Sequence, residues 1–101
     1  MRVIVFFDLP VLTLADRKEY RQFRHFLIKT GFVMLQESVY SKLVLNSTAA
    51  TTVENIVQAS APSKGIVQLL TITEKQYASI KYITGEFVSE YINSTDRMVI
   101  L

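Results

Sequence analysis

An α+β fold is the architecture that the sequence predicts, and three observations lead to it. The chain has 101 residues, of which 50% are hydrophobic and 20% charged, with only three glycines and two prolines, so we expect one compact domain over residues 1–101. Over residues 1–73, apolar segments with the periods of strands and helices follow in the order strand, helix, strand, strand, helix, strand. Residues 74–101 form a shorter extension. This order is typical of ferredoxin-like βαββαβ sandwiches.

The first strand is expected from Arg2 to Asp8, within the opening "MRVIVFFDLP". Alternation along a strand places two sets of side chains on opposite faces: Arg2, Ile4, Phe6 and Asp8 on one, and Val3, Val5, Phe7 and Leu9 on the other. Both sets are largely apolar. The strand should therefore have neighbours on each side and be covered on at least one face.

A long helix is predicted from "TLADRKEYRQFRHFLIKTG". Thr13 and Asp16 have the spacing of a capping box at its start, and Gly31 is a helix-terminating residue at its end. Its apolar side chains recur at helical spacing and predict a buried stripe, made of Tyr20, Phe23, Phe26, Leu27 and Ile28.

The remaining elements are predicted from patterns in the second half of the chain. The segment "FVMLQESVYSKLVLN" contains two strands, with the break between them near Gln36 and Glu37. A second helix starts after residue 46, buries Val53, Ile56 and Val57, and ends before Pro62; "GIVQLLTIT" follows as a strand. In the extension, a capping box at residues 73–76 predicts a short helix, and "RMVIL" predicts a closing strand.

Composition limits the classes of protein that this chain can belong to. Cysteine is absent, which excludes disulfide scaffolds and thiolate metal sites and fits a reducing compartment. Neither a signal-peptide pattern nor an apolar run of about 20 residues is present, so we expect a cytoplasmic protein without a membrane span. The charge is uneven: residues 1–46 carry seven Lys or Arg against four Asp or Glu, and residues 47–101 carry four against five. A basic partner surface would lie in the first half.

Asp8 is an ionisable residue at the end of an apolar strand, and two interpretations are open. It can accept backbone hydrogen bonds in the turn that follows, which is the commoner role of such a residue. It can also be a metal ligand, since Mg²⁺ is often held by one or two carboxylates with waters and phosphates. The other acids of this half, Asp16, Glu19 and Glu37, have no spacing that places them beside Asp8. A metal site would therefore need a second copy of the chain.

The long helix carries a broad basic face made of two adjacent stripes. One stripe contains Arg17, Arg21 and Arg24, and the other contains Lys18, His25 and Lys29. The face can be an ordinary solvated surface or a phosphate-binding surface, and the preponderance of arginine favours nucleic acid slightly. His25 is the only histidine; it can be a general base, but without a carboxylate partner in the sequence it more simply extends the basic face.

Three separated motifs, in order, give the chain a resemblance to a known family. They are "FFDLP", the segment "KTGFVMLQESVYSKL" and "LLTITEKQY". Together they resemble the small core protein of CRISPR adaptation, the second of the two near-universal CRISPR-associated proteins, in its type II variety. The resemblance implies a ferredoxin-like homodimer in which the Asp8 carboxylates face each other across the two-fold axis and hold Mg²⁺. One departure is Glu37, which separates Gln36 from Ser38 where many relatives have a Gln, an aromatic or basic residue, and then "SV".

Members of that family are described in two roles, and the sequence favours one of them. The resemblance implies either a bridge that holds integrase dimers around duplex DNA during spacer acquisition or a metal-dependent endonuclease acting on RNA or duplex DNA. We favour the adaptor, with weak Mg²⁺-dependent cleavage centred on Asp8, because a nuclease usually needs more than one acid per chain. A single-stranded-RNA endoribonuclease is the alternative. A ferredoxin-like small-molecule sensor is disfavoured, because the sequence has no glycine-rich effector loop.

The end of the chain is predicted to take part in the dimer. The last strand is apolar and lies beyond a complete βαββαβ unit, whose sheet has a free edge. We expect it to add to the sheet edge of the partner subunit. The residues concerned are Arg97, Met98, Val99, Ile100 and Leu101.

Overall fold

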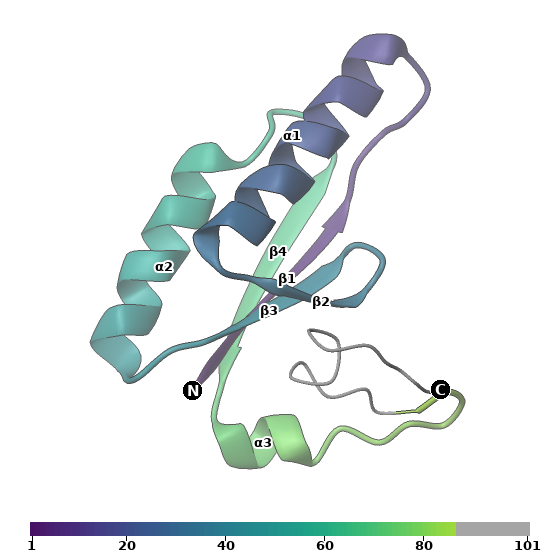
Figure 1. Ribbon diagram of the computed structural model, residues 1–101. Coiled ribbons are helices and arrows are strands. Elements are labelled where there is room, and N and C mark those ends of the chain that lie inside the picture. Colours follow the sequence, from purple (N-terminus) through teal and green to yellow (C-terminus); the bar gives the residue numbers. More distant parts are fainter. Residues whose placement is uncertain (87–101) are drawn as a thin grey trace.

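A computed structural model of the chain describes residues 1–86 and shows two helices packed on one face of a four-stranded antiparallel sheet (Figure 1). The strand order is β2-β3-β1-β4. The elements in chain order are β1 (Arg2–Asp8), α1 (Leu14–Thr30), β2 (Val33–Gln36), β3 (Val39–Leu43), α2 (Ser47–Ser60), β4 (Ile66–Ile72) and α3 (Glu74–Ala78). The predicted βαββαβ order is confirmed. None of the helices within residues 1–86 is long and apolar enough to cross a membrane.

The β1 strand is central, and its two faces have different environments. It pairs with β3 on one side and with β4 on the other, and the pairing with β4 extends over the whole length of β1. Val3, Val5 and Phe7 are buried under the helices in the main core. On the other face Ile4 is buried, but Phe6 is 36% exposed and Asp8 is exposed. The strand is therefore covered completely on the helix side only.

The ends of α1 follow the predicted capping chemistry. The Thr13 side chain accepts a hydrogen bond from the Asp16 amide, and the Asp16 carboxylate accepts one from the Thr13 amide. Gly31 ends the helix in the left-handed region at φ 105°. The predicted buried stripe is confirmed for Phe23 and Leu27 and is wrong for Ile28, which is 47% exposed. Ile28 lies one position around the helix from Leu27, and that rotation of about 100° turns it away from the sheet.

The hairpin and the second helix also match their predicted positions. The break between β2 and β3, predicted near Gln36 and Glu37, is a turn at Glu37 and Ser38, and Gln36 is the last residue of β2. In α2, Val53 and Val57 are buried, whereas Ile56, predicted to be buried, is 41% exposed. Positions four residues apart share the sheet-facing side of this helix, and Ile56 lies beside that side.

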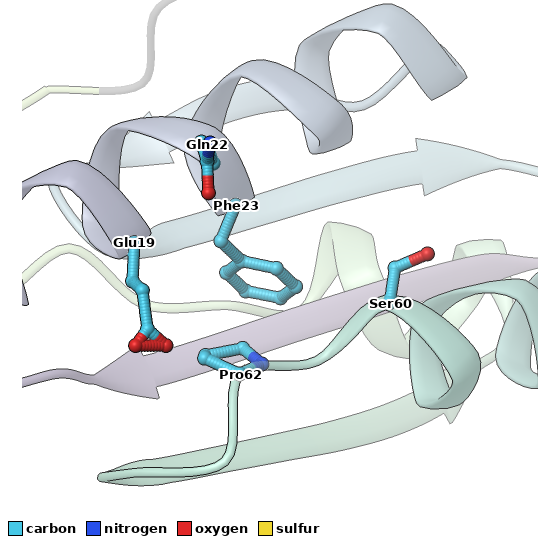
Figure 2. A pocket seen from close by; sticks show the side chains of 5 residues that line it. All are labelled: Glu19, Gln22, Phe23, Ser60 and Pro62. Carbon is cyan, nitrogen blue, oxygen red and sulfur yellow. The ribbon is translucent and has the colours of Figure 1, made fainter.

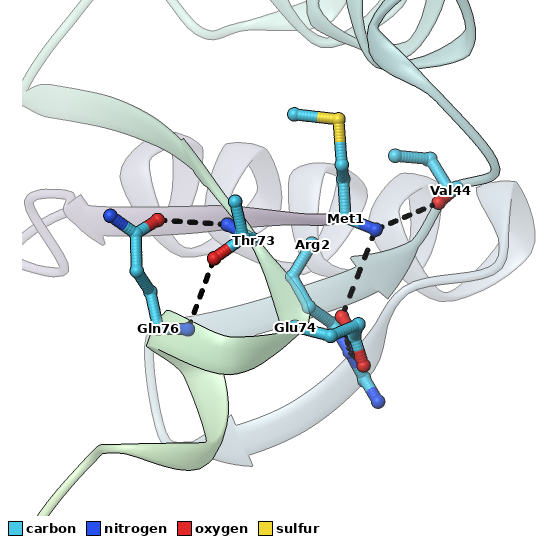
Figure 3. A network of polar contacts seen from close by, with 6 residues as sticks. All are labelled: Met1, Arg2, Val44, Thr73, Glu74 and Gln76. Atoms are coloured by element: carbon cyan, nitrogen blue, oxygen red, sulfur yellow. Dashed lines mark hydrogen bonds and ion pairs between the residues drawn. The ribbon is translucent and has the colours of Figure 1, made fainter.

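A polar network ties α3 to the start of β1 (Figure 3). The Thr73 and Gln76 capping box is present as predicted. Arg2 donates from Nε to both oxygens of Glu74, at 3.2 and 3.0 Å, and its guanidinium lies 4.3 Å from the centroid of the Tyr77 ring. This network fixes the direction in which the chain leaves the sheet. The predicted closing strand, residues 97–101, lies outside the described residues.

Candidate functional site

Asp8 is the last residue of β1, and its carboxylate is exposed on the face of the sheet opposite the helices. Phe7 before it is buried in the core under α1, so strand alternation turns Asp8 to the other side. Its backbone lies opposite Ile66 of β4. Within residues 1–86, no hydrogen bond or ion pair engages the carboxylate, so the interpretation that it caps the following turn is not supported there.

Gly65 packs against the backbone of Asp8, and the sequence patterns did not identify this contact. Its φ is +81°, and a Cβ at this position would lie 2.6 Å from the Asp8 carbonyl oxygen and 3.0 Å from the Leu9 Cα. No other residue type fits without moving the backbone that carries Asp8. The signal in the sequence is a glycine directly before a strand, but its contact with Asp8 depends on the pairing of β1 with β4.

The other acids of the first half do not complete a metal site with Asp8. Asp16 is buried: its carboxylate caps α1 and lies 3.7 Å from Lys64 Nζ. The hydrogen bond from the Thr13 backbone lowers the pKa of Asp16 below its ordinary value of 3.8, against the opposing effect of desolvation. Within residues 1–86, no three His, Asp or Glu side chains are grouped closely enough to bind a metal ion. One chain therefore supplies Asp8 without further protein ligands from this part.

Glu19 and Glu37 lie in two different places. Glu19 lines a hollow of about 130 Å³ between α1 and the segment after α2, where it points toward Pro62 (Figure 2). Glu37 is exposed in the β2–β3 turn. The carbonyl of Ser38 in that turn accepts a hydrogen bond from the Phe7 amide at 3.0 Å, so the turn is at the same end of the sheet as Asp8. Glu37 therefore adds negative charge at this end.

The basic face of α1 is exposed as the sequence predicts. Its members are Arg17, Lys18, Arg21, Arg24, His25 and Lys29, and all six are exposed. The ion pairs found within residues 1–86 involve other cations, so no described carboxylate neutralises this face. Five Arg and Lys side chains on neighbouring turns of one helix, with His25 among them, give a concentrated positive surface.

Arg24 differs from the other basic residues of α1, because it is anchored to the protein. Its Nε donates a hydrogen bond to the Tyr40 hydroxyl at 3.0 Å. Tyr40 is 1% exposed and belongs to an aromatic cluster around Phe7. In that cluster, Phe7 has edge contacts with Tyr20 and Phe23, and the Tyr20 hydroxyl is hydrogen-bonded to Ser38. The same cluster thus holds the end of β1 and the β2–β3 turn against α1.

A model of the family "CRISPR associated protein Cas2" matches residues 1–80. The chain belongs to this family. Proteins named CRISPR-associated endoribonuclease Cas2 are similar over the full chain: one from Treponema denticola is 52% identical over 101 residues, and one from Ligilactobacillus salivarius is 46% identical, with all of both chains covered in each case. A third, from Streptococcus mutans, is 48% identical over all of this chain and 93% of the relative.

The Cas2 fold is also found in the structure comparison. The crystal structure of Streptococcus pyogenes Cas2 at pH 6.5 covers 83% of this chain and 100% of its own, with a TM-score of 0.61 and 15% sequence identity. The resemblance inferred from the motifs is therefore confirmed, and so is the ferredoxin-like fold.

Within this Cas2-family chain, the structure separates the two predicted functional elements. The Asp8 carboxylate is on the helix-free face of the sheet, and the basic residues are on α1 over the opposite face. His25 is on α1 as well, so it is not placed as a general base beside Asp8. In a single chain, the Asp8 carboxylate and the basic face of α1 therefore lie on opposite sides of the sheet.

Proposed function

We propose that this Cas2-family protein is a dimeric duplex-DNA-binding adaptor in CRISPR spacer acquisition, acting in the cytoplasm and bridging integrase dimers. The observation that carries the proposal is the basic face of α1, whose six members have no carboxylate partner among the described residues. Unpaired Arg and Lys side chains on one rigid helix suit the regular phosphates of a duplex. In a dimer this surface occurs twice.

The homodimer is supported by the helix-free face of the sheet. Strand register places apolar side chains from three strands on that face, and several are well exposed: Phe6 36%, Leu43 52%, Ile66 58% and Leu70 51%. The face borders a hollow of about 550 Å³, lined mainly by apolar side chains, between the sheet and residues 80–84. Exposed apolar surface of this kind is typical of an interface. A second copy packed on this face would place both Asp8 carboxylates on the interface side of the sheet, and in the proposed dimer they face each other across the two-fold axis.

The composition of the Asp8 site fits a shared Mg²⁺ ion. The carboxylate is exposed and unengaged within residues 1–86, and Mg²⁺ accepts one or two carboxylates completed by waters and phosphate oxygens. When bound, such an ion would supply charge stabilisation and a more acidic water for phosphodiester cleavage. Asp8 would thus act as both the metal ligand and the catalytic residue.

A metal-dependent endoribonuclease is the second candidate, and the names of the relatives favour it, since they are called endoribonucleases. The geometry of this chain supports the adaptor more strongly, because Asp8 has neither a histidine nor two further acids grouped with it within residues 1–86. Any cleavage should therefore be weak. Duplex binding by α1 does not need Asp8.

Asp8→Asn separates the two functions. Wild type and variant are each titrated with a labelled duplex in the presence of a chelator, and are then incubated with RNA and with duplex DNA in Mg²⁺. We expect the variant to keep duplex binding and to lose any cleavage that the wild type shows. Loss of duplex binding by Asp8→Asn would contradict the adaptor proposal, whereas cleavage that persists in the purified variant would contradict the role of Asp8.

A further inference from the structure

We propose that Tyr40 is a positioning residue for DNA binding: it holds the Arg24 guanidinium in an orientation that receives a phosphate. The inference rests on the proposed function, since it concerns the same basic face. Its starting point is the hydrogen bond from Arg24 Nε to the Tyr40 hydroxyl at 3.0 Å. Of the basic side chains on α1, Arg24 is the one whose charged group donates to another side chain within residues 1–86.

The Tyr40 hydroxyl is a fixed point, because the residue is held on every side. Its side chain is 1% exposed, and its ring is stacked on Phe7 with centroids 5.7 Å apart and planes inclined by 22°. Its backbone lies in β3 opposite Val5 of the central strand. The acceptor that Arg24 uses is therefore part of the rigid core and not a second mobile surface group.

Fixing Nε determines how the rest of the guanidinium is presented. The group is planar and has five N–H donors, of which the bond to Tyr40 uses one, so four remain on the two terminal nitrogens. Arg24 is exposed, and no carboxylate pairs with it among the described residues. Two parallel donors held in a set plane match the bidentate geometry of a phosphate.

Because Tyr40 already orders the Arg24 side chain, that side chain should lose less conformational entropy when the protein binds DNA. A free arginine must be ordered when it contacts a phosphate, whereas Arg24 is already ordered by Tyr40. Ordering one such side chain corresponds to roughly a threefold to tenfold change in affinity, so Tyr40→Phe should weaken duplex binding by about that factor. The charge remains, so the variant should keep the salt dependence of wild type.

A double-mutant cycle tests the inference. The duplex affinity is measured over a range of salt concentrations for wild type, Tyr40→Phe, Arg24→Ala and the double variant. Arg24→Ala should weaken binding and reduce the salt slope by about 0.9, because one phosphate is no longer neutralised. Tyr40→Phe should weaken binding with the slope unchanged, and it should have no further effect in the Arg24→Ala background.

Two more variants serve as controls, one for the loss of a hydroxyl from the aromatic cluster and one for the charge of Arg24. Tyr20→Phe removes another hydroxyl of the same aromatic cluster, one that bonds Ser38 and not Arg24, so duplex affinity should not change. Arg24→Lys keeps the charge but lacks the planar group with its Nε donor, so it should lose affinity as Tyr40→Phe does. An unchanged affinity for Tyr40→Phe, or an equal loss in the Arg24→Ala background, would overturn the inference.

The failure of this inference can be distinguished from the failure of the proposed function. If charge reversal at Arg17 and Arg21 weakens duplex binding but Tyr40→Phe does not, the surface binds DNA and Tyr40 does not position Arg24. If neither change has an effect, both proposals are wrong.

Discussion

At the scale of single residues, the position of Asp8 depends on a neighbour that has no side chain. Gly65 adopts φ +81° and approaches the Asp8 carbonyl so closely that a Cβ would lie 2.6 Å from it. Gly85 has a similar backbone conformation, at φ +94°, with nothing within 4 Å of the corresponding position. Both glycines have a positive φ, but only Gly65 is crowded at the position of a Cβ.

Gly65→Ala should therefore destabilise the protein more than Gly85→Ala. Both changes place a side chain in the left-handed region, at a cost of about 1 kcal/mol, but only Gly65→Ala also forces a backbone displacement. We expect a free energy of unfolding lower by roughly 2 kcal/mol or more for Gly65→Ala, measured by urea denaturation. An equal decrease in the free energy of unfolding for the two variants would show that the close contact with Asp8 does not contribute to the cost of Gly65→Ala.

The individual candidate residues were largely predictable from the sequence, but their contacts were not. An acid after an apolar run and an arginine-rich helix face are visible in the residue pattern alone. The bond between Arg24 and Tyr40 joins residues 16 positions apart, and it depends on how β3 pairs with β1 and how α1 lies over both. Strand register and helix packing decide that contact, and local patterns do not encode either.

At the scale of elements, the helix ends were predictable because capping is local chemistry. Thr13, Asp16 and Gly31 act through backbone groups within one turn of themselves. Burial was less predictable: Ile28 and Ile56 are apolar and have helical spacing, yet both lie outside the stripe that the sheet covers. How wide a stripe the sheet covers is a property of packing, which a helical period does not fix.

The cap of α1 gives a pH dependence with a defined sign. The hydrogen bond from the Thr13 backbone lowers the pKa of Asp16 in the folded state, so at acidic pH the unfolded state binds more protons. The stabilisation is fully present above the ordinary pKa of 3.8, which applies to the unfolded state, and is lost as the pH falls through the lower folded value.

Asp16→Asn removes this titration while keeping a residue of the same shape. Wild type should be more stable than the variant at pH 7, and the difference in free energy of unfolding should shrink below about pH 4. Urea denaturation of both proteins at pH 7 and at pH 3 measures it. A difference that stays constant between the two pH values would exclude the ionised Asp16 cap as its source.

At the scale of the whole molecule, our proposal assigns DNA binding to the helix side of the sheet and dimerisation to the opposite face. The helix side contains the core and presents the basic face of α1, while the opposite side exposes apolar side chains and Asp8. The fold and its element order were predictable from alternating periods. The exposed apolar face was not, because a strand whose two faces are both apolar does not reveal which of them a helix covers.

The proposed role of residues 97–101 in the dimer can be tested by truncation. If "RMVIL" adds to the sheet of the partner subunit, deleting residues 96–101 should weaken the dimer and, with it, any metal site shared by the two Asp8 carboxylates. Sedimentation velocity over a range of protein concentrations should show a larger monomer fraction for the truncated protein. A truncated protein that remains a tight dimer would contradict this role of the tail.

Phe6→Glu tests the apolar face itself, with Leu12→Glu as a matched control. Phe6 is on the helix-free face, whereas Leu12 is 86% exposed in the loop before α1. The charge at Phe6 should shift the protein toward monomer because burying it in an interface is unfavourable, and the same change at Leu12 should not. A dimer unaffected by Phe6→Glu would place the interface elsewhere.

The salt dependence of duplex-DNA binding tests the central claim most directly. It is measured for wild type, for Arg17→Glu with Arg21→Glu, and for Lys75→Glu, which reverses an exposed charge on α3 as a control. Arg24 is left intact, so that its bond to Tyr40 is preserved. We predict weaker binding and a slope shallower by about 0.9 per phosphate that is no longer neutralised for the α1 variant, with little change for the control. An α1 variant with the affinity and slope of wild type would contradict the proposal that this face binds DNA.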